Sequence, residues 1–210
     1  MRTLLGLIGK KVGMTRMFDS NGNVVPVTLI KAGPCVITDV RTIERNGYEA
    51  VQLGFEEIKD YRVTKPVREA FKKKGVQCFR ILREFPVRGA GETYKVGDAV
   101  TAEIFEKIAA IKVSGRSKGC GFSGGVKQWG FRGAPGSHGT SKVHRKPMSA
   151  GATDAARVFK GKRSPGRMGN ENVTVRNLKV MKVDAGSNLV AVKGAIPGKR
   201  NSIVLLTQEK

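Results

Sequence analysis

The chain has 210 residues, of which 40% are hydrophobic and 6% aromatic, so it can bury a core and is not disordered throughout. It carries 39 Lys and Arg against 17 Asp and Glu, and this formal net charge of +22 indicates a polyanionic partner. Three widely spaced cysteines without a CxxC pair argue against a disulfide framework. The sequence shows neither a signal peptide nor an apolar run of ~18 residues. We therefore expect an intracellular protein with no membrane partner.

The first part of the chain carries strand signals. Residues 24–30 are rich in β-branched side chains, which favour strands. Residues 36–45 and 48–55 flank Asn46-Gly47, a dipeptide typical of a two-residue type I′ turn, and therefore predict a β-hairpin. Apolar residues alternate with others in the second of these segments, a pattern typical of a half-buried strand.

A helix is predicted at residues 64–75, within a small insertion that covers residues 58–90. Pro66 suits the first helical turn, and Gly75 suits the C-terminal end. Three apolar side chains fall on one helical face: Val67, Ala70 and Phe71.

Strand signals return after this insertion. Residues 101–105 predict a strand, and the apolar run 108–113 follows it. Four further strands, separated by Gly, Asn and Pro turns, are predicted at residues 173–175, 178–183, 189–194 and 202–206. Many short strands of this kind are typical of a barrel or a sandwich. We therefore predict a mainly β fold: a barrel formed by residues 1–112 and 170–210, interrupted by the insertion and by an extension over residues 113–169.

The positive charge is concentrated between residues 112 and 169. This stretch holds 13 Lys and Arg and a single acid, Asp154, together with both histidines, the only Trp and about half of the glycines. It shows no sustained period of 2.0 or 3.6 residues. A segment of this length without its own core is normally functional or ordered by a partner. We therefore expect an extended basic loop.

Gly119, Gly121 and Gly124 spell GxGxxG, the spacing of a loop that cradles a dinucleotide. Such a loop needs a helix that opens at the third glycine and an acid about 20 residues later. The sequence that follows contains five glycines and Pro135 and reaches no acid before Asp154. A dinucleotide site is therefore excluded.

Other catalytic and metal-binding patterns are also incomplete. Residues 161–168 approach a P-loop but lack its terminal Lys-Ser/Thr. Cys120, His138 and His144 lack the paired spacing of a zinc site, and Ser137 next to His138 has no acid nearby to complete a triad. We expect no catalytic residue, metal, cofactor or small-molecule substrate.

Glycine and basic residues together favour RNA as the polyanion. Glycine lets the backbone approach phosphates closely, and Lys and Arg neutralise them. Trp129, near Phe131 and Arg132, either stacks on an unpaired base or packs on the barrel at the root of the loop. DNA binding would call for a recognition helix or a zinc finger, and the sequence predicts neither.

Five long motifs, together with PVTLIKAGPCVI, carry a resemblance over essentially the whole chain: LIGKKVGMTRMF (7–18), VSGRSKGCGFSGGVKQWGF (113–131), SHGTSKVHRKP (137–147), VFKGKRSPGRMGNENVTV (158–175) and NLVAVKGAIPG (188–198). On these motifs the sequence resembles the bacterial form of the large-subunit ribosomal protein L3 family. It departs from the family at Lys112, Cys120 and Gln128, and its loop tip lacks the family's Pro-Gly.

The resemblance implies a β-barrel like those of translation factors and a loop that runs through rRNA. It implies a structural constituent of the large subunit, not an enzyme, that binds 23S rRNA near its 3′ end and helps to nucleate early assembly. The loop would reach towards the peptidyl transferase centre and support it. The partners would be 23S rRNA and neighbouring large-subunit proteins, and the location would be cytoplasmic. The alternative, a barrel-containing translation or RNA-modifying factor that visits the ribosome, would need a nucleotide site or a catalytic constellation.

The predicted rRNA contacts are basic, histidine and tryptophan side chains of the opening motif and of the basic loop: Lys10, Lys11, Arg16, Arg116, Lys118, Lys127, Trp129, Arg132, His138, Lys142, His144, Arg145, Lys146, Arg157, Lys160, Lys162, Arg163 and Arg167. The predicted tip near the peptidyl transferase centre consists of Ser149, Ala150, Gly151, Ala152, Thr153 and Asp154.

Overall fold

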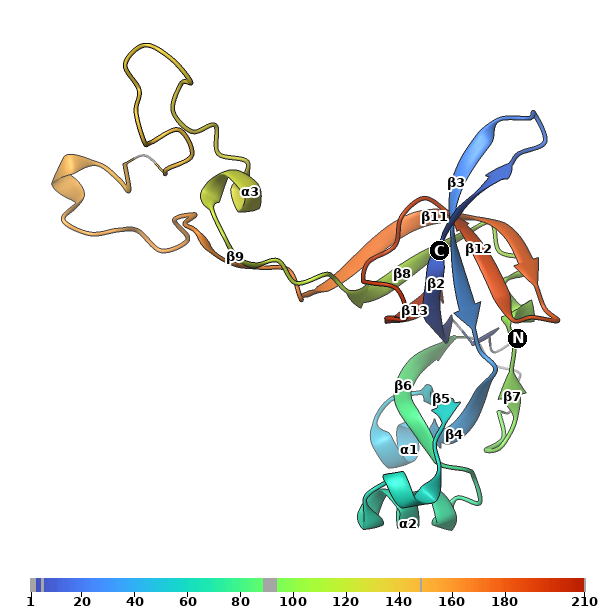
Figure 1. The fold of residues 1–210 in the computed structure, drawn as a ribbon. Helices are drawn as coiled ribbons and strands as arrows, with labels where there is room; N and C mark the ends of the chain where they lie inside the picture. The colour runs from blue at the N-terminus through green and yellow to red at the C-terminus, as the bar shows by residue number, and fades with distance from the viewer. Residues whose placement is uncertain (1–2, 5, 89–93, 148, 210) are drawn as a thin grey trace. The chain divides into compact units, whose positions relative to one another are not determined.

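The computed structural model contains two compact units (Figure 1). The first comprises Met1–Arg116 and Asn172–Lys210, and the second comprises Ser117–Glu171. The structure describes residues 3–4, 6–88, 94–147 and 149–209. The end of the expected insertion, residues 89–90, therefore lies outside the described residues.

A closed six-stranded barrel is the larger part of the first unit. Around the barrel the strands are β11 (Asn172–Asp184), β12 (Leu189–Lys193), β3 (Val24–Ala32), β2 (Gly6–Phe18), β13 (Ile203–Gln208) and β8 (Ala110–Arg116). All neighbouring strands are antiparallel, including β11 and β8, whose pairing closes the barrel. The prediction of a mainly β fold built on a barrel is confirmed.

Alternating side chains and local bulges explain how these strands curve around a core. In β3, the side chains of Val25, Val27 and Ile30 are buried. Val24 and Pro26, which alternate with the first two, are exposed. The long strands β2 and β11 both contain register shifts against their partners. Such bulges bend a strand and increase its twist, which a small closed barrel requires. The two strands expected on either side of residue 176 are therefore one bent strand, β11.

Two glycines of β2 allow the barrel to pack tightly. A Cβ atom on Gly6 would lie 2.1 Å from the carbonyl oxygen of Leu206. A Cβ atom on Gly9 would lie 2.8 Å from the side chains of both Ile30 and Leu206. A methyl group at either position would collide with β13, so Gly6 and Gly9 allow the close packing of these two strands.

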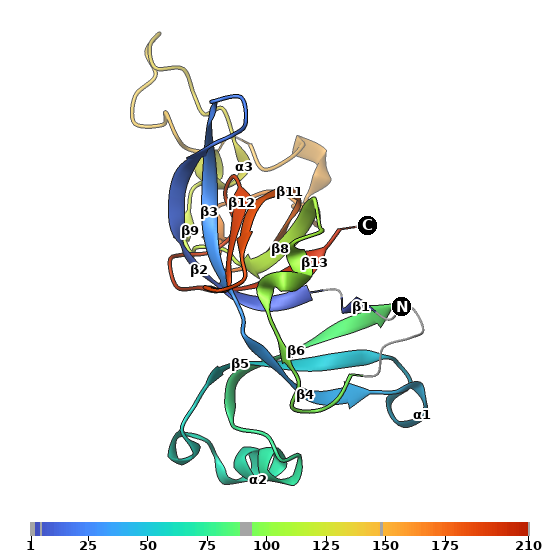
Figure 2. The ribbon, with the colours of Figure 1, turned by 90° about the vertical axis from the view of Figure 1, so that its right-hand side faces the viewer.

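A second, five-stranded sheet packs beneath the barrel within the first unit (Figure 2). Its strands, in spatial order, are β1 (Thr3–Leu4), β6 (Phe79–Arg88), β5 (Ala50–Glu57), β4 (Cys35–Arg41) and β7 (Ala99–Val100). One hydrophobic cluster joins the two sheets, because Ile37, Val51 and Phe85 from this sheet pack together with Leu7 and Ile8 from the barrel. The hairpin segments and part of the predicted insertion therefore belong to a sheet of their own rather than to the barrel.

Two local predictions of secondary structure are wrong: the type I′ turn at Asn46-Gly47 and the strand at residues 101–105. β4 pairs with β5 as expected, but the connection is a helical turn, α1 (Ile43–Asn46), which Gly47 ends with φ 77° and an N–H bond to the Ile43 carbonyl oxygen. Glycine with positive φ suits a helix C-terminus as well as a type I′ turn, so the dipeptide alone is ambiguous. Residues 101–105 form a 3-10 turn, η2 (Ala102–Phe105), since a short buried apolar run does not distinguish a strand from a helical turn.

The predicted helix is confirmed as α2 (Lys65–Lys73), preceded by the 3-10 turn η1 (Asp60–Arg62). The chain leaves the helix at Gly75, which has φ 67°. Phe71 is buried and meets Phe79 of β6 edge-to-face, with ring centroids 6.2 Å apart. The other two apolar side chains of the expected face are exposed, so Phe71 is the anchor that fastens α2 to the sheet.

The second unit contains short regular elements. It has a two-stranded ribbon of β9 (Gly121–Ser123) and β10 (Gly166–Met168), a short helix α3 (Gly125–Trp129) and a 3-10 turn η3 (Thr153–Ala155). The rest of its described residues form turns and irregular backbone.

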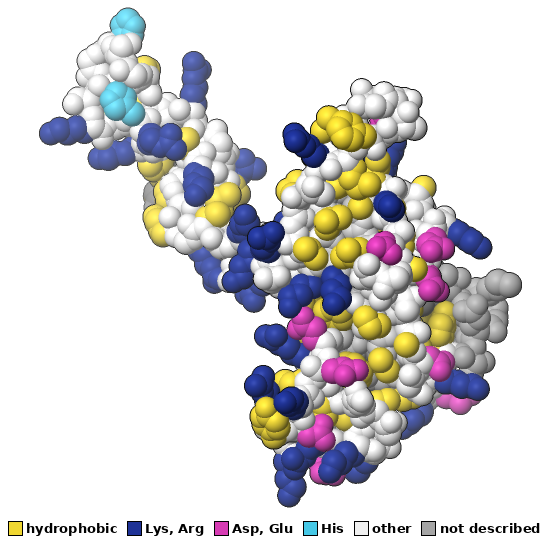
Figure 3. Space-filling model, turned by 45° about the vertical axis from the view of Figure 1, so that its right-hand side comes forward, with side chains coloured by type: hydrophobic (Ala, Val, Ile, Leu, Met, Phe, Trp, Pro, Cys, Tyr) yellow, Lys and Arg dark blue, Asp and Glu magenta, His cyan; other side chains and the backbone are white. Residues whose placement is uncertain are grey.

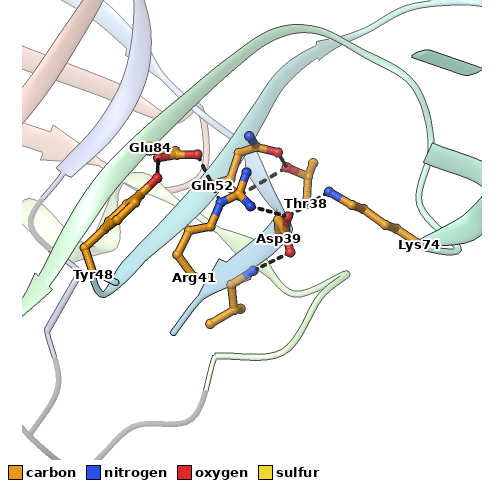
Figure 4. Close-up of polar contacts among 8 residues, drawn as sticks. Thr38, Asp39, Arg41, Tyr48, Gln52, Lys74 and Glu84 are labelled. Atoms are coloured by element: carbon orange, nitrogen blue, oxygen red, sulfur yellow. Dashed lines mark hydrogen bonds and ion pairs between the residues drawn. The ribbon is translucent and has the colours of Figure 1, made fainter. Parts of the chain in front are cut away.

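A polar network links the strands of the five-stranded sheet to the end of α2 (Figure 4). Lys74 Nζ donates to Asp39 Oδ2 over 2.9 Å, and Arg41 Nη1 lies 3.6 Å from the same oxygen. Arg41 Nε and Tyr48 Oη donate to the two carboxylate oxygens of Glu84, over 3.2 and 2.7 Å. Partial burial alone would raise the pKa of Asp39, but the hydrogen bond and charge of Lys74 and the charge of Arg41 outweigh it and lower that pKa.

We expect Asp39→Asn to destabilise the first unit at neutral pH by about 0.2–1 kcal/mol, the usual contribution of solvent-screened ion pairs. A folded-state pKa below the unfolded value means that this contribution is complete above the unfolded pKa of about 3.9 and disappears as the pH falls through the folded-state pKa. Urea unfolding of the variant and of an exposed control, Glu44→Gln, from pH 7 to pH 2 measures it. A difference that persists undiminished at pH 2 would contradict this origin.

Replacing residues 117–171 by an Asn-Gly turn should leave a folded first unit. Both hydrophobic clusters of the described residues consist only of first-unit side chains, and Arg116 already pairs with Asn172. Shortening a loop lowers its closure entropy, so we expect an unfolding midpoint that is unchanged or raised by up to roughly 5 °C. Calorimetry of the deletion variant beside the full chain tests this. A molten or insoluble product would show that the barrel needs the second unit.

Candidate nucleic-acid interface

The second unit presents its positive charge entirely to solvent. It holds eleven Lys and Arg but only two acids, Asp154 and Glu171, and all eleven basic residues are exposed. On the face drawn in Figure 3, Lys, Arg and both histidines lie over this unit, whereas acidic side chains lie among the basic ones on the first unit. Like charges this close repel each other, and a polyanion would relieve that repulsion. The interface predicted from composition is therefore accessible on the second unit.

A narrow antiparallel ribbon forms the base of the second unit. β9 pairs with β10, and beyond the strands the Cys120 amide donates to the Met168 carbonyl and the Ser117 amide to the Glu171 carbonyl, each over 2.9 Å. Gly169 has φ 74°, and a Cβ atom there would lie 2.1 Å from the Lys118 carbonyl oxygen. Only glycine permits this close crossing.

The GxGxxG spacing has a structural explanation. Gly121 opens β9 with φ 65°, and Gly124 is the residue before α3. The expectation that no helix follows the third glycine is therefore wrong. The helix has only five residues and ends at Gly130 with φ 72°, so it is far shorter than the helix of a dinucleotide fold.

Trp129, at the end of α3, holds the segment around Ser164 that leads back into β10. Its Nε1 donates to the Ser164 carbonyl oxygen over 2.8 Å, and the Arg163 guanidinium lies 5.4 Å from its ring centroid. One residue earlier, Gln128 Nε2 donates to the Arg167 carbonyl oxygen over 3.1 Å. Trp129 thus has an internal anchoring role, which neither sequence alternative anticipated, while 40% of it stays exposed. Stacking on a base stays a prediction.

A second set of hydrogen bonds folds residues 131–146 back on themselves. The Ala134 amide donates to the His144 carbonyl oxygen over 3.0 Å, and His144 Nδ1 lies 3.0 Å from the Pro135 carbonyl oxygen. Gly133 has φ 75°, and a Cβ atom there would lie 2.2 Å from that His144 carbonyl oxygen. His144 therefore shapes this loop. Both histidines are exposed, and His138 has φ 59°.

The predicted tip, residues 149–154, is exposed throughout and held locally. Ser149 Oγ both donates to the Gly151 carbonyl, over 2.8 Å, and accepts from the Gly151 amide. Lys162 Nζ donates to the Ser149 carbonyl oxygen over 3.2 Å and so links the tip to the segment that precedes β10. Asp154 lies in the first turn of η3, where a negative charge suits the helix dipole.

The predicted contacts of the first unit differ in availability. Lys11 is 9% exposed, and its Nζ donates to the carbonyl oxygens of Ile196 and Gly198, between β12 and β13, over 2.8 and 3.1 Å. A phosphate contact by Lys11 stays a prediction. Lys10 pairs with Glu56 over 2.6 Å. Arg16 and Arg116 are exposed.

Sequence reasoning missed Phe122, which is 80% exposed in the middle of β9. Phe122 lies opposite Arg167 of β10 in the ribbon, and an exposed aromatic ring of this kind can stack on a base. Its place between two glycines of a basic segment was the signal that could have identified it. Among the residues that the structure describes, no group of three His, Cys, Asp or Glu side chains could hold a metal ion, and no helix is long and apolar enough to cross a membrane.

A closed barrel that carries an exposed unit with eleven basic residues and two acids is the arrangement expected of a protein that binds a polyanion. The family model described as ribosomal protein L3 matches residues 90–190. The protein named large ribosomal subunit protein uL3 from Heliobacterium modesticaldum is 49% identical over 96% of this chain and 95% of its own length. The proteins of that name from Thermotoga petrophila and Pelotomaculum thermopropionicum are each 50% identical over 97% of this chain and over 97% and 96% of their own lengths. The chain therefore belongs to the uL3 family of ribosomal proteins, which are structural proteins and not enzymes.

Removing the indole N–H by Trp129→Phe should loosen the segment around Ser164, because the variant keeps a ring for Arg163 but loses the hydrogen bond to the Ser164 carbonyl oxygen. A lost hydrogen bond of about 1 kcal/mol corresponds to roughly fivefold faster exchange of amides whose opening depends on it. Hydrogen–deuterium exchange of residues 162–168 measures this, with residues 143–146 as an internal control. Equal acceleration in both segments would point to general unfolding of the unit instead.

Proposed function

We propose that this chain binds 23S rRNA near its 3′ end as a constituent of the large ribosomal subunit, and helps to nucleate early subunit assembly. Its first unit contacts neighbouring large-subunit proteins, and its second unit reaches towards the peptidyl transferase centre and supports it. The observation that carries rRNA binding is the set of eleven exposed basic residues on a unit with two acids. The 3′-end site, the assembly role and the direction of the loop rest on the resemblance to the family.

Phosphate contacts provide the affinity in this proposal. Each phosphate that a Lys or Arg neutralises releases condensed counterions, so binding weakens as salt rises. The glycine-rich backbone leaves room for phosphates to approach, and the arginines can bind them through two donors at once. The protein acts by position and charge, and the chemistry of peptide transfer belongs to the RNA.

The rival function, a barrel-containing factor that visits the ribosome, makes a different prediction in a salt wash. An integral constituent stays on purified large subunits at moderately high salt, whereas a visiting factor is removed. Recovery of the chain in the wash fraction at a salt concentration that leaves the other subunit proteins bound would overturn the proposal.

Replacing Lys142, Arg145 and Lys160 together by Ala should make the affinity of the protein for 23S rRNA less dependent on salt. The slope of log K against log salt is negative, and three lost phosphate contacts should reduce its magnitude by about 2–3, at about 0.7–0.9 per contact. Filter binding of full-length 23S rRNA from 50 to 300 mM KCl measures the slope. The matched control is Lys65, Lys72 and Lys73 to Ala on α2, which the proposal leaves outside the interface. Equal slopes for wild type and the first variant would contradict the proposed interface.

A further inference from the structure

A cavity of about 500 Å³ lies within the second unit. Three stretches of chain line it: residues 131–133, residues 146–147 with 149–150, and residue 162 with 164–165. Its volume falls in the range of about 300–1,000 Å³ typical of small-molecule and cofactor sites. The charge pattern of the unit does not by itself require such a hollow, because phosphate neutralisation needs only exposed side chains.

The lining of the cavity combines apolar surfaces with positive charge. Phe131, Pro147 and Pro165 contribute apolar surface, and Arg132, Lys146 and Lys162 contribute the cations. None of the described lining residues is acidic. A nucleotide has matching parts, since its base is a flat ring that stacks on aromatic and apolar side chains and its phosphate is an anion.

Hydrogen bonds hold the first two walls in place. The Ala134 amide donates to the His144 carbonyl oxygen over 3.0 Å and joins the segments around residues 132 and 146. The Lys146 amide donates to the Val143 carbonyl oxygen over 3.1 Å and closes a turn within the second segment. The ring of Phe131 packs against Gly125, where an added Cβ atom would lie 2.6 Å from it. The apolar wall is therefore fixed by the start of α3.

The third wall is attached to the other two. Trp129 Nε1 holds the Ser164 carbonyl, and Lys162 Nζ holds the Ser149 carbonyl across the cavity. A site whose walls are already held loses little conformational entropy when a ligand enters. The hollow is thus a shaped feature of the fold.

We propose that this cavity receives the base of one unpaired rRNA nucleotide, which packs on Phe131 and the two prolines while Arg132 and Lys146 contact its phosphates. The inference rests on the proposed rRNA binding and adds a specific site to it. An acidic peptide would satisfy the cations but would leave the apolar wall without a matching partner, whereas a nucleotide satisfies both. The basic unit as a whole brings RNA to the cavity entrance.

Filling the cavity tests the proposal without removing an anchor. Ala150 lines the cavity and Ala152 does not, and both are exposed tip residues. Ala150→Trp should exclude the base, and Ala152→Trp is the control of equal size. Subunits are reconstituted with each full-length variant, and the 23S rRNA is probed with reagents that modify unpaired bases. We expect one nucleotide that is protected by the wild type and by Ala152→Trp to become reactive with Ala150→Trp.

A second variant removes the stacking surface instead of filling the space. Phe131→Leu should expose the same nucleotide and weaken binding of 23S rRNA by roughly 5- to 150-fold, the range for losing one base–aromatic contact. Exchange of the amides of residues 143–146 verifies that the unit keeps its fold. Two outcomes would overturn the cavity proposal while salt-dependent binding of the wild type leaves the proposed function standing. One is identical base reactivity with the wild type and all three variants. The other is that Ala150→Trp and Phe131→Leu expose different nucleotides. Absence of salt-dependent binding by the wild type would overturn both the cavity proposal and the proposed function.

Discussion

The antiparallel pairing of β8 with β11 is the constraint on which the rest of the structure depends. This pairing closes the barrel, and it continues to Arg116 and Asn172, the residues that flank the second unit in the chain. Because the two strands are neighbours, the chain can leave the barrel and return to it at adjacent positions. The barrel core is complete without any side chain of the inserted unit. A long basic segment can therefore be carried at no expense to the core.

The second unit is organised differently, because it has no hydrophobic cluster among its described residues. Hydrogen bonds to backbone carbonyls, made by Trp129, Gln128 and Lys162, hold its segments together. Positive φ angles at glycines such as Gly133 and Gly169 allow the close backbone crossings between them. Side chains freed from packing are then available at the surface, and nearly all charged ones are cations. A polyanion would stabilise this arrangement by removing the repulsion among them.

Much of the first unit could be predicted from local patterns. Alternation and β-branched residues locate the barrel strands, and Pro66 and Gly75 locate α2 within one or two residues. The patterns failed where one signal suits two structures. Gly47 ends a helical turn rather than a type I′ turn, and the buried run around Phe105 is a 3-10 turn rather than a strand. The separate five-stranded sheet was not predicted either, since the pairing of β4, β5 and β6 away from the barrel depends on contacts distant in sequence.

The sequence by itself determined the chemical character of the partner and the place of the basic segment in the chain, because charge, glycine content and motif order are properties of composition and need no coordinates. Only the tertiary structure decided what individual residues in that segment do. It buried Lys11 against the connection between β12 and β13, gave Trp129 an anchoring bond to Ser164, and brought Phe131, Pro147 and Pro165 around one cavity. These outcomes depend on hydrogen bonds and packing between residues far apart in the chain, and a local pattern carries no information about which distant segments will meet.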